Sequence, residues 1–246
     1  RSLAVPNRMT VITLFVDPPR PGLVFPDLVK QSVLSAGEAA ELYQAIFQDL
    51  LLSATASGGD VLINYRPDDL LPTKFTDESE PAAEKISQIA ASTIETLDNI
   101  RFEVQIGSTQ SARVGNTVTH LLDKEDHSSV GILQPTVASI SRSDLDSAAM
   151  KQRRADVVIG PGQANKIYYA GFSTPIDFSG VFDSSPLASV IQGANDADLK
   201  TSLLDMHPVL SDIQGLKTYI SHAHARKKAG LPFAEHTVDV IETLDL

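Results

Sequence analysis

The sequence predicts an α/β fold of three layers, in which a Rossmann-like mixed sheet, mostly parallel with one antiparallel strand, carries helices on both faces. Apolar runs rich in β-branched residues alternate along the chain with segments of helical periodicity. The 246 residues are 42% hydrophobic, enough for one large core, and we expect residues 1–246 to form a single domain. Only a short loop separates the apolar runs 156–159 and 167–172, which predicts the antiparallel return.

The first half of the chain begins with a predicted central strand at residues 9–16, MTVITLFV, because parallel strands buried on both faces are continuously apolar. Ser35 and Glu38 have the spacing of a capping box and predict a helix that ends at Gly58-Gly59. The other elements expected here are a loop or irregular helical turn at 23–34, strands at 60–65 and 102–106, and a helix at 79–97.

The second half contains two further helix starts with side-chain caps. Ser141 with Asp144 begins a helix predicted to run to about residue 153, and Asp212 begins one predicted to run to 229. The other expected elements are strands at 130–133, 156–159 and 167–172, helices at 112–123, 186–197 and 198–204, a short strand at 208–210, and a last strand or ordered tail at 237–241.

Composition narrows the class of partner. A formal net charge of -11 argues against a nucleic-acid or anionic-membrane surface, because both require clustered Lys and Arg. The chain has no cysteine, which excludes disulfides and thiol chemistry, and it has no apolar run long enough to cross a bilayer. From the charge and the short apolar runs we expect no nucleic-acid partner and no membrane association. No signal peptide is visible, so we expect a cytoplasmic location.

Short catalytic motifs do not identify a reaction. The sequence has no Gly-x-Ser-x-Gly elbow, Walker loop or Gly-x-Gly-x-x-Gly, so hydrolase, P-loop and dinucleotide-binding interpretations lack support. His222 and His224 are two apart on a predicted helix and therefore point away from each other. The remaining histidines have no ligand spacing; they are His120, His127, His207 and His236.

Several strings stand in a fixed order between residues 10 and 219: FVDPPRPG at 15–22, EAAELY at 38–43 with Asp49 further along the helix, residues 105–113, and Gly160-Pro161 followed by Tyr168 and Gly171. In this order and spacing they resemble the glycosyltransferase-A-like family of unknown function, also described as rSAM/selenodomain-associated transferases. The resemblance implies a nucleotide-diphospho-sugar transferase-like fold that binds a nucleotide or nucleotide sugar, usually with a divalent metal.

The chain departs from that family at positions that should carry positive charge. The family has a lysine after the first strand, where this chain has Asp17, and a Lys-Thr-Arg run where it has Phe25-Pro26-Asp27. Such cations neutralise phosphates in enzymes of this shape. A polyphosphate at Asp17 and Asp27 would meet like charge, at a cost on the order of a few kcal/mol in a partly desolvated site.

The metal-binding carboxylates that the family implies are also replaced. Thr136 stands in the place of the aspartate that follows the fourth strand, and Ala164 in the place of an aspartate after Gly160-Pro161. Mg²⁺ and Mn²⁺ are normally held by at least one carboxylate. We therefore expect no metal and no other cofactor, and Mg²⁺ or Mn²⁺ only if the chain is an active transferase with a rearranged site.

Other polar groups remain candidates for ligand binding, and the loop after residue 159 is where ligand chemistry is expected in this fold. Arg20 and Arg113 keep their family positions as phosphate contacts, with surface salt bridges as the alternative. Lys166 is either a replacement cation or a solvated loop lysine. The full set of ligand-binding candidates is Arg20, Arg113, Gln134, Thr136, Gly160, Asn165, Lys166 and Asp212, with no catalytic residue assigned.

Three hypotheses for the function follow. The leading one is a divergent transferase-like protein that has lost metal-dependent transfer and acts in binding, regulation or as a scaffold, with a nucleotide or sugar-like small molecule as its ligand. The second is a working glycosyltransferase or nucleotidyltransferase that uses Arg20, Arg113, Lys166 and either Asp212 or Asp144. The third is a structural subunit of a homo-oligomer, which predicts a large exposed apolar patch or a symmetric interface.

Overall fold

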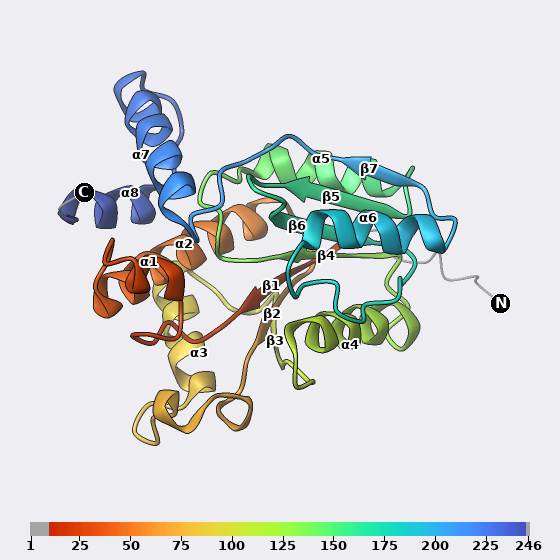
Figure 1. Cartoon of the computed structure of the whole chain (residues 1–246), viewed down its shortest axis with the longest axis horizontal. Coiled ribbons are helices and arrows are strands. Elements are labelled where there is room, and N and C mark those ends of the chain that lie inside the picture. The colour runs from red at the N-terminus through yellow and green to blue at the C-terminus, as the bar shows by residue number, and fades with distance from the viewer. Residues whose placement is uncertain (1–9, 245–246) are drawn as a thin grey trace.

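The computed structural model describes residues 10–244 and has one seven-stranded sheet with helices on both of its faces (Figure 1). Its strand order is β3-β2-β1-β4-β6-β5-β7. All neighbours are parallel except those of β6, which runs antiparallel to both β4 and β5, so the predicted mixed sheet is confirmed. The strands are β1 (Thr10–Val16), β2 (Val61–Tyr65), β3 (Ile100–Val104), β4 (Ser129–Leu133), β5 (Val157–Pro161), β6 (Ile167–Phe172) and β7 (Thr201–Leu203).

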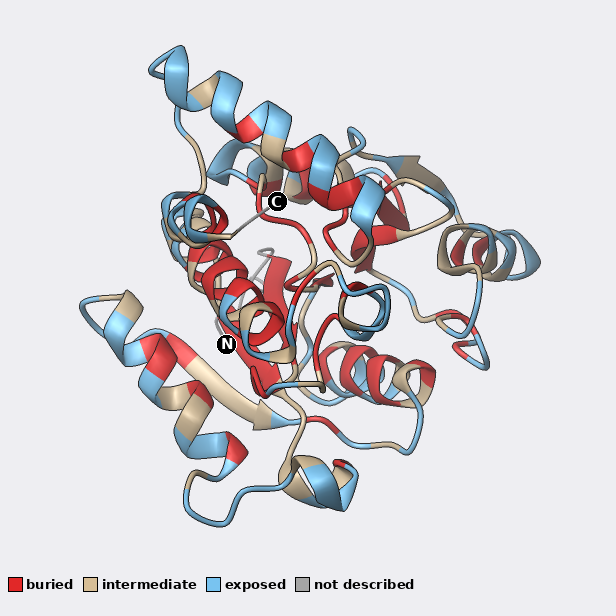
Figure 2. Cartoon of the chain, turned by 60° about the vertical axis from the view of Figure 1, so that its left-hand side comes forward, coloured by how far each residue is buried: buried red, intermediate tan, exposed pale blue. Residues whose placement is uncertain are grey.

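Eight α-helices of the described residues complete the layers, and burial is concentrated where they face the strands (Figure 2). Successive residues of β1 face two cores: Leu14 belongs to the core that includes residues of α2, α3, α5, α7 and α8, and Phe15 belongs to the core that includes residues of α4 and α6. The helices are α1 (Pro26–Lys30), α2 (Ala36–Ala56), α3 (Ala82–Thr93), α4 (Gln110–Asp123), α5 (Arg142–Gln152), α6 (Pro186–Asp196), α7 (Ile213–Lys228) and α8 (Glu235–Thr243).

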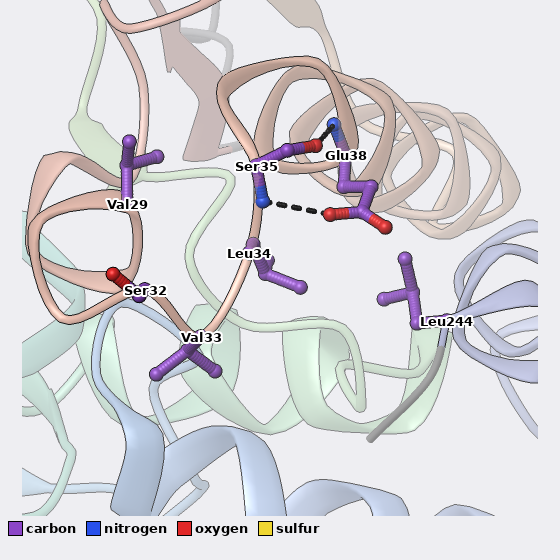
Figure 3. Close-up of a pocket in the computed structure, with 7 residues that line it drawn as sticks. All are labelled: Val29, Ser32, Val33, Leu34, Ser35, Glu38 and Leu244. Carbon is purple, nitrogen blue, oxygen red and sulfur yellow. Dashed lines mark hydrogen bonds between the residues drawn. The ribbon is translucent and has the colours of Figure 1, made fainter.

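The predicted helix caps are confirmed. At the start of α2 the Ser35 hydroxyl accepts from the Glu38 amide at 3.2 Å, and the Ser35 amide donates to the Glu38 carboxylate at 2.7 Å (Figure 3). Ser141 and Asp144 make the same reciprocal pair at α5. The Asp212 carboxylate accepts from the Gly215 amide at α7. These caps satisfy amides that have no acceptor within their helix.

Several predicted boundaries and three predicted elements are wrong. Residues 198–204 form no helix; β7 lies there and pairs with β5 at the edge of the sheet. Residues 208–210 make no strand, and residues 237–241 belong to helix α8. β3 begins two residues earlier than predicted because Ile100 pairs with Val61 of β2. α3 is shorter than 79–97, and the segment 23–34 contains the short helix α1.

The predicted first strand included Met9, which lies outside the described residues. Among residues 10–244, none of the helices combines the length and apolar character needed to cross a bilayer.

Candidate functional site

The carboxyl ends of the parallel strands gather polar side chains at one edge of the sheet. Asp17 follows β1, Arg66 follows β2, and Gln105 and Gln134 follow β3 and β4. Because β6 runs in the opposite direction, Lys166 precedes it at this same edge. Ligands of open α/β sheets bind at this edge, where the loops diverge. We call it the carboxyl edge.

Asp17 sits between two arginines at the carboxyl edge. Its carboxylate lies 3.9 Å from the Arg66 guanidinium. Burial raises the pKa of Asp17, and the nearby charges of Arg66 and Arg113 oppose that rise without cancelling it. Burial, followed by repulsion from Arg66, lowers the pKa of Arg113. The two guanidinium charges are therefore partly neutralised by Asp17 within the protein. Arg66 was missed in the sequence because nothing in its spacing marks it.

Arg113 is buried and belongs to a hydrogen-bonded network with Gln105. Its Nε donates to the Gln105 side chain at 2.9 Å, and Gln105 in turn donates to the carbonyls of Val16 and Asn64 at 3.1 and 2.9 Å. The arginine therefore ties α4 to the ends of β1 and β2. The sequence alone does not predict this structural role of Arg113, because it does not show that the ends of β1 and β2 lie next to α4.

Arg20 is also occupied inside the protein. It is 7% exposed, and its guanidinium contacts the Asp68 carboxylate at 2.6 Å and donates to the carbonyls of Phe75 and Glu80. The same Asp68 accepts from the Ala82 amide at 2.7 Å, at the start of α3. Arg20 thus holds the loop that links β2 to α3.

Lys166 forms an ion pair with Asp212 and a 3.0 Å hydrogen bond with the Ser211 hydroxyl. Gln163 lies in the same turn and exchanges two hydrogen bonds with the backbone of Val209, at 2.7 and 2.9 Å. Although burial favours protonation of Asp212, hydrogen bonds from Lys166 and Gly215 dominate and lower the pKa of Asp212. The lysine and the carboxylate therefore neutralise each other.

The hairpin that carries Lys166 is a tight turn with a structural role. Ala164 and Asn165 have φ angles of 51° and 64°, and the Lys166 amide donates to the Gln163 carbonyl. This is a type I′ turn, which matches the twist of antiparallel strands. The Asn165 side chain accepts from the Ala188 amide at 3.0 Å and so caps α6.

The last three candidates are placed by backbone contacts and packing. The Gln134 amide donates to the Tyr168 carbonyl at 3.4 Å. The Thr136 carbonyl accepts from the Leu210 amide, while its hydroxyl is buried and has no partner among the described residues. A side chain on Gly160 would lie 2.4 Å from the Tyr168 ring, so glycine is required there by packing.

These contacts separate the predicted site residues into groups with different partners. Thr136, Lys166 and Asp212 are brought close by the link from Thr136 to Leu210. Arg20 contacts the loop before α3, and Arg113 contacts Gln105. Within the described residues, no hydrogen bond or ion pair joins Arg20 or Arg113 to Lys166.

The group around Lys166 does not fit a divalent metal. The Asp212 carboxylate is held by the Lys166 ammonium on one oxygen and by the Gly215 amide on the other. A divalent cation at ~4 Å from an ammonium is repelled by roughly 8 kcal/mol at an effective dielectric constant of about 20. Thr136 and Ala164 offer no negative oxygen to offset this repulsion.

A second acidic group lies at the opposite side of the fold from Lys166, on β3 and the end of α4. Glu103, His120 and Glu125 place one ligand atom each within 4.8 Å of one another. Arg101 contacts both carboxylates, at 3.1 and 2.8 Å, so its guanidinium offsets part of their charge and occupies one oxygen of each. The arrangement is an ion-pair network on the surface.

A hollow of about 650 Å³ opens between α2, the start of α5, α7 and the segment before α8. None of the eight predicted ligand-binding residues lines it. The sequence did not indicate its polar residues as a group, and only Asp144 is among the residues of a predicted transferase site. Ser139 and His207 carry no motif and are 68 residues apart, so only the fold brings them together.

The fold is that of a known class. No family model matches the chain, and no curated protein matches it in sequence. A structure from Desulfovibrio desulfuricans G20, assigned as a nucleotide-diphospho-sugar transferase, superposes with a TM-score of 0.76 at 20% identity, over 95% of this chain and 94% of that one. The 4-diphosphocytidyl-2C-methyl-D-erythritol synthase of Anaerococcus prevotii DSM 20548 superposes with a TM-score of 0.50 at 10% identity, over 86% and 97%. The chain therefore has a nucleotide-diphospho-sugar transferase-like fold.

Proposed function

We propose that this chain is a divergent nucleotide-diphospho-sugar transferase-like protein that binds a nucleotide or sugar-like small molecule at the carboxyl edge without metal-dependent transfer, in a binding, regulatory or scaffold role. The ion pair of Lys166 with Asp212 carries the proposal. It places a fixed positive charge on the carboxylate that a metal would need. The resemblance to the rSAM/selenodomain-associated transferases agrees with this, because the carboxylates of that family are replaced here.

The arginines support a ligand of low charge. Arg20 donates to the Asp68 carboxylate and to two carbonyls, and the charges of Arg66 and Arg113 are shared with Asp17. A diphosphate would have to displace these internal partners before it gained charge-assisted hydrogen bonds. A neutral or singly charged ligand needs no such exchange, and the half-buried side-chain amide of Gln134 can offer it neutral hydrogen bonds.

Calorimetric titration with nucleoside diphosphates and nucleotide sugars, with and without Mn²⁺, tests the proposal. We expect Mn²⁺ to leave the affinity unchanged and any diphosphate to bind more weakly than roughly 100 µM. The reason is that the site offers neither free cations nor a free carboxylate. Micromolar affinity that appears only with Mn²⁺ would contradict the proposal.

Two lysine variants test whether the ion pair of Lys166 with Asp212 prevents Mn²⁺ from binding. Lys166→Ala frees the Asp212 carboxylate, so we expect Mn²⁺ to bind this variant more tightly than the natural chain. Lys200→Ala removes the same charge from an exposed position near the opposite end of β5 and should leave Mn²⁺ binding unchanged. Equal effects of the two substitutions would show that only net charge matters.

A further inference from the structure

The 650 Å³ hollow brings together three side chains from separate segments of the chain. Ser139 lies in the connection between β4 and α5, Asp144 in the first turn of α5, and His207 in the connection between β7 and α7. All three line the hollow. Ser139 and His207 are half-buried, so the group is screened from water and still open to the hollow.

The contacts among them have the order nucleophile, base and acid. The Ser139 hydroxyl lies 3.0 Å from His207 Nδ1, and His207 Nε2 lies 3.6 Å from Asp144 Oδ1. With Ser139 as the donor, Nδ1 is the acceptor and Nε2 carries the proton that faces Asp144. A serine is activated when a histidine accepts its proton and a carboxylate orients the histidine and stabilises its charge.

The Asp144 carboxylate is fixed and ionised. Its second oxygen accepts from both the amide and the hydroxyl of Ser141 at 2.7 Å. Although burial raises the pKa of Asp144, the contact with His207 and the hydrogen bonds from Ser141 outweigh burial and lower this pKa to about 2. The carboxylate is thus negatively charged at neutral pH and available to an imidazolium.

The His207 ring is held in place by β5 and β6. Its backbone amide donates to the Pro161 carbonyl at 3.2 Å, and the Tyr168 ring meets it edge-on at 5.2 Å with an interplanar angle of 90°. The Tyr168 hydroxyl donates to the Asp205 carbonyl at 2.7 Å, which fixes the tyrosine in turn. A base held in this way needs little reorganisation to accept a proton.

We propose that Ser139, His207 and Asp144 form a nucleophilic serine site that cleaves carboxylic esters. Ser139 Oγ forms a bond to the ester carbonyl carbon while His207 Nδ1 takes the serine proton. The carbon–oxygen bond to the alcohol then breaks, and His207 returns the proton to the leaving alkoxide. Water releases the acyl group: His207 takes its proton, the hydroxide adds to the carbonyl, and Ser139 leaves and regains the proton.

The walls of the hollow suit an acyl group that is mostly apolar and carries one polar function. Tyr219 lines the hollow and is 2% exposed, and its buried hydroxyl has no partner among the described residues. Arg142 and Ser143 also line the hollow, and first-turn amides of a helix have no acceptor within it. Such amides can stabilise a developing oxyanion. The apolar wall consists of Leu52, Ala56, Ala138, Ile140, Ala223 and Phe233.

Covalent labelling of the full chain with a fluorophosphonate, followed by hydrolysis of p-nitrophenyl butyrate, tests the proposal. We expect one label per chain, located on Ser139 by peptide mass spectrometry, and none in Ser139→Ala. His207→Gln should slow labelling by about 100-fold or more, because it removes the base. The natural chain should hydrolyse the ester, and Ser139→Ala should show only the background rate.

A serine outside the hollow provides the control. Ser92 is exposed on α3, and its hydroxyl donates to the Ile89 carbonyl at 2.9 Å. Ser92→Ala should keep both labelling and ester hydrolysis. Circular dichroism of each variant, compared with the natural chain, verifies that the fold is intact. An unlabelled natural chain, or labelling that persists in Ser139→Ala, would overturn the proposal.

Discussion

Replacing Asp49 with alanine is expected to lower the free energy of unfolding by about 3 kcal/mol, because buried amides of α8 lose a charged acceptor. Asp49 lies on α2 and is 7% exposed. One of its oxygens accepts from the His236 amide at 3.2 Å, and the other accepts from the amide and hydroxyl of Thr237 at 2.8 and 2.6 Å. Asp49 thus caps α8 from another helix and attaches it to α2.

Urea denaturation followed by circular dichroism measures this effect. A loss of ~3 kcal/mol corresponds to a fall in melting temperature of roughly 6 to 12 °C for a domain of this size. Asp239→Ala removes an exposed carboxylate from α8 itself and should leave stability unchanged within experimental error. If Asp49→Ala behaves like Asp239→Ala, the cap does not hold α8 in place.

Arg20→Ala is expected to destabilise the fold by about 3 kcal/mol, since it leaves a partly buried carboxylate and two carbonyls without their donor. The guanidinium contacts Asp68 at 2.6 Å and the Glu80 carbonyl at 2.8 Å, and its side chain is 8% exposed. Arg20→Lys should lose part of this energy, because one ammonium cannot reproduce the planar fork. Thermal and urea unfolding of both variants give the measurement.

Lys30, an exposed cation, serves as the control that distinguishes a structural role of Arg20 from a role in ligand binding. Lys30 pairs with Asp27 at 3.8 Å, with both side chains largely exposed, so Lys30→Ala should leave the stability unchanged within error. A phosphate-binding Arg20 would instead produce variants of natural stability that lose affinity for a nucleotide. That outcome would contradict the structural role described above.

The parts of the fold that the sequence predicted are those with local causes. The capping boxes at Ser35 and Ser141 involve residues three apart, and the apolar run of β1 is continuous. The missed elements depend on distant partners. β7 is a strand only because β5 pairs with it, and α8 is a helix whose cap, Asp49, lies 187 residues away from His236.

The position of Asp49 did contain a signal. It lies three residues after Ile46 and seven after Leu42, on the buried stripe of α2. A carboxylate on such a stripe requires a partner, because an isolated buried charge is costly. The sequence therefore indicated that a partner existed, and only the fold shows that this partner is the start of α8.

The candidate site was predicted only in part. The carboxyl edge follows from the order of strands and helices, but the internal partners of Arg20 and Lys166 depend on loops whose paths the sequence does not determine. Ser139 and His207 have no motif, and each is an ordinary half-buried residue when considered alone. Their contact depends on how the segment after β7 passes over α5.

Anomalous scattering from crystals soaked with Mn²⁺ and a nucleotide sugar tests the central claim most directly. We expect no manganese peak within coordination distance of Thr136, Ala164 and Asp212, because Lys166 is paired with the Asp212 carboxylate that the metal would need. A manganese peak there, with a diphosphate bound to it and Lys166 displaced, would show that this edge of the sheet holds a metal-complexed diphosphate.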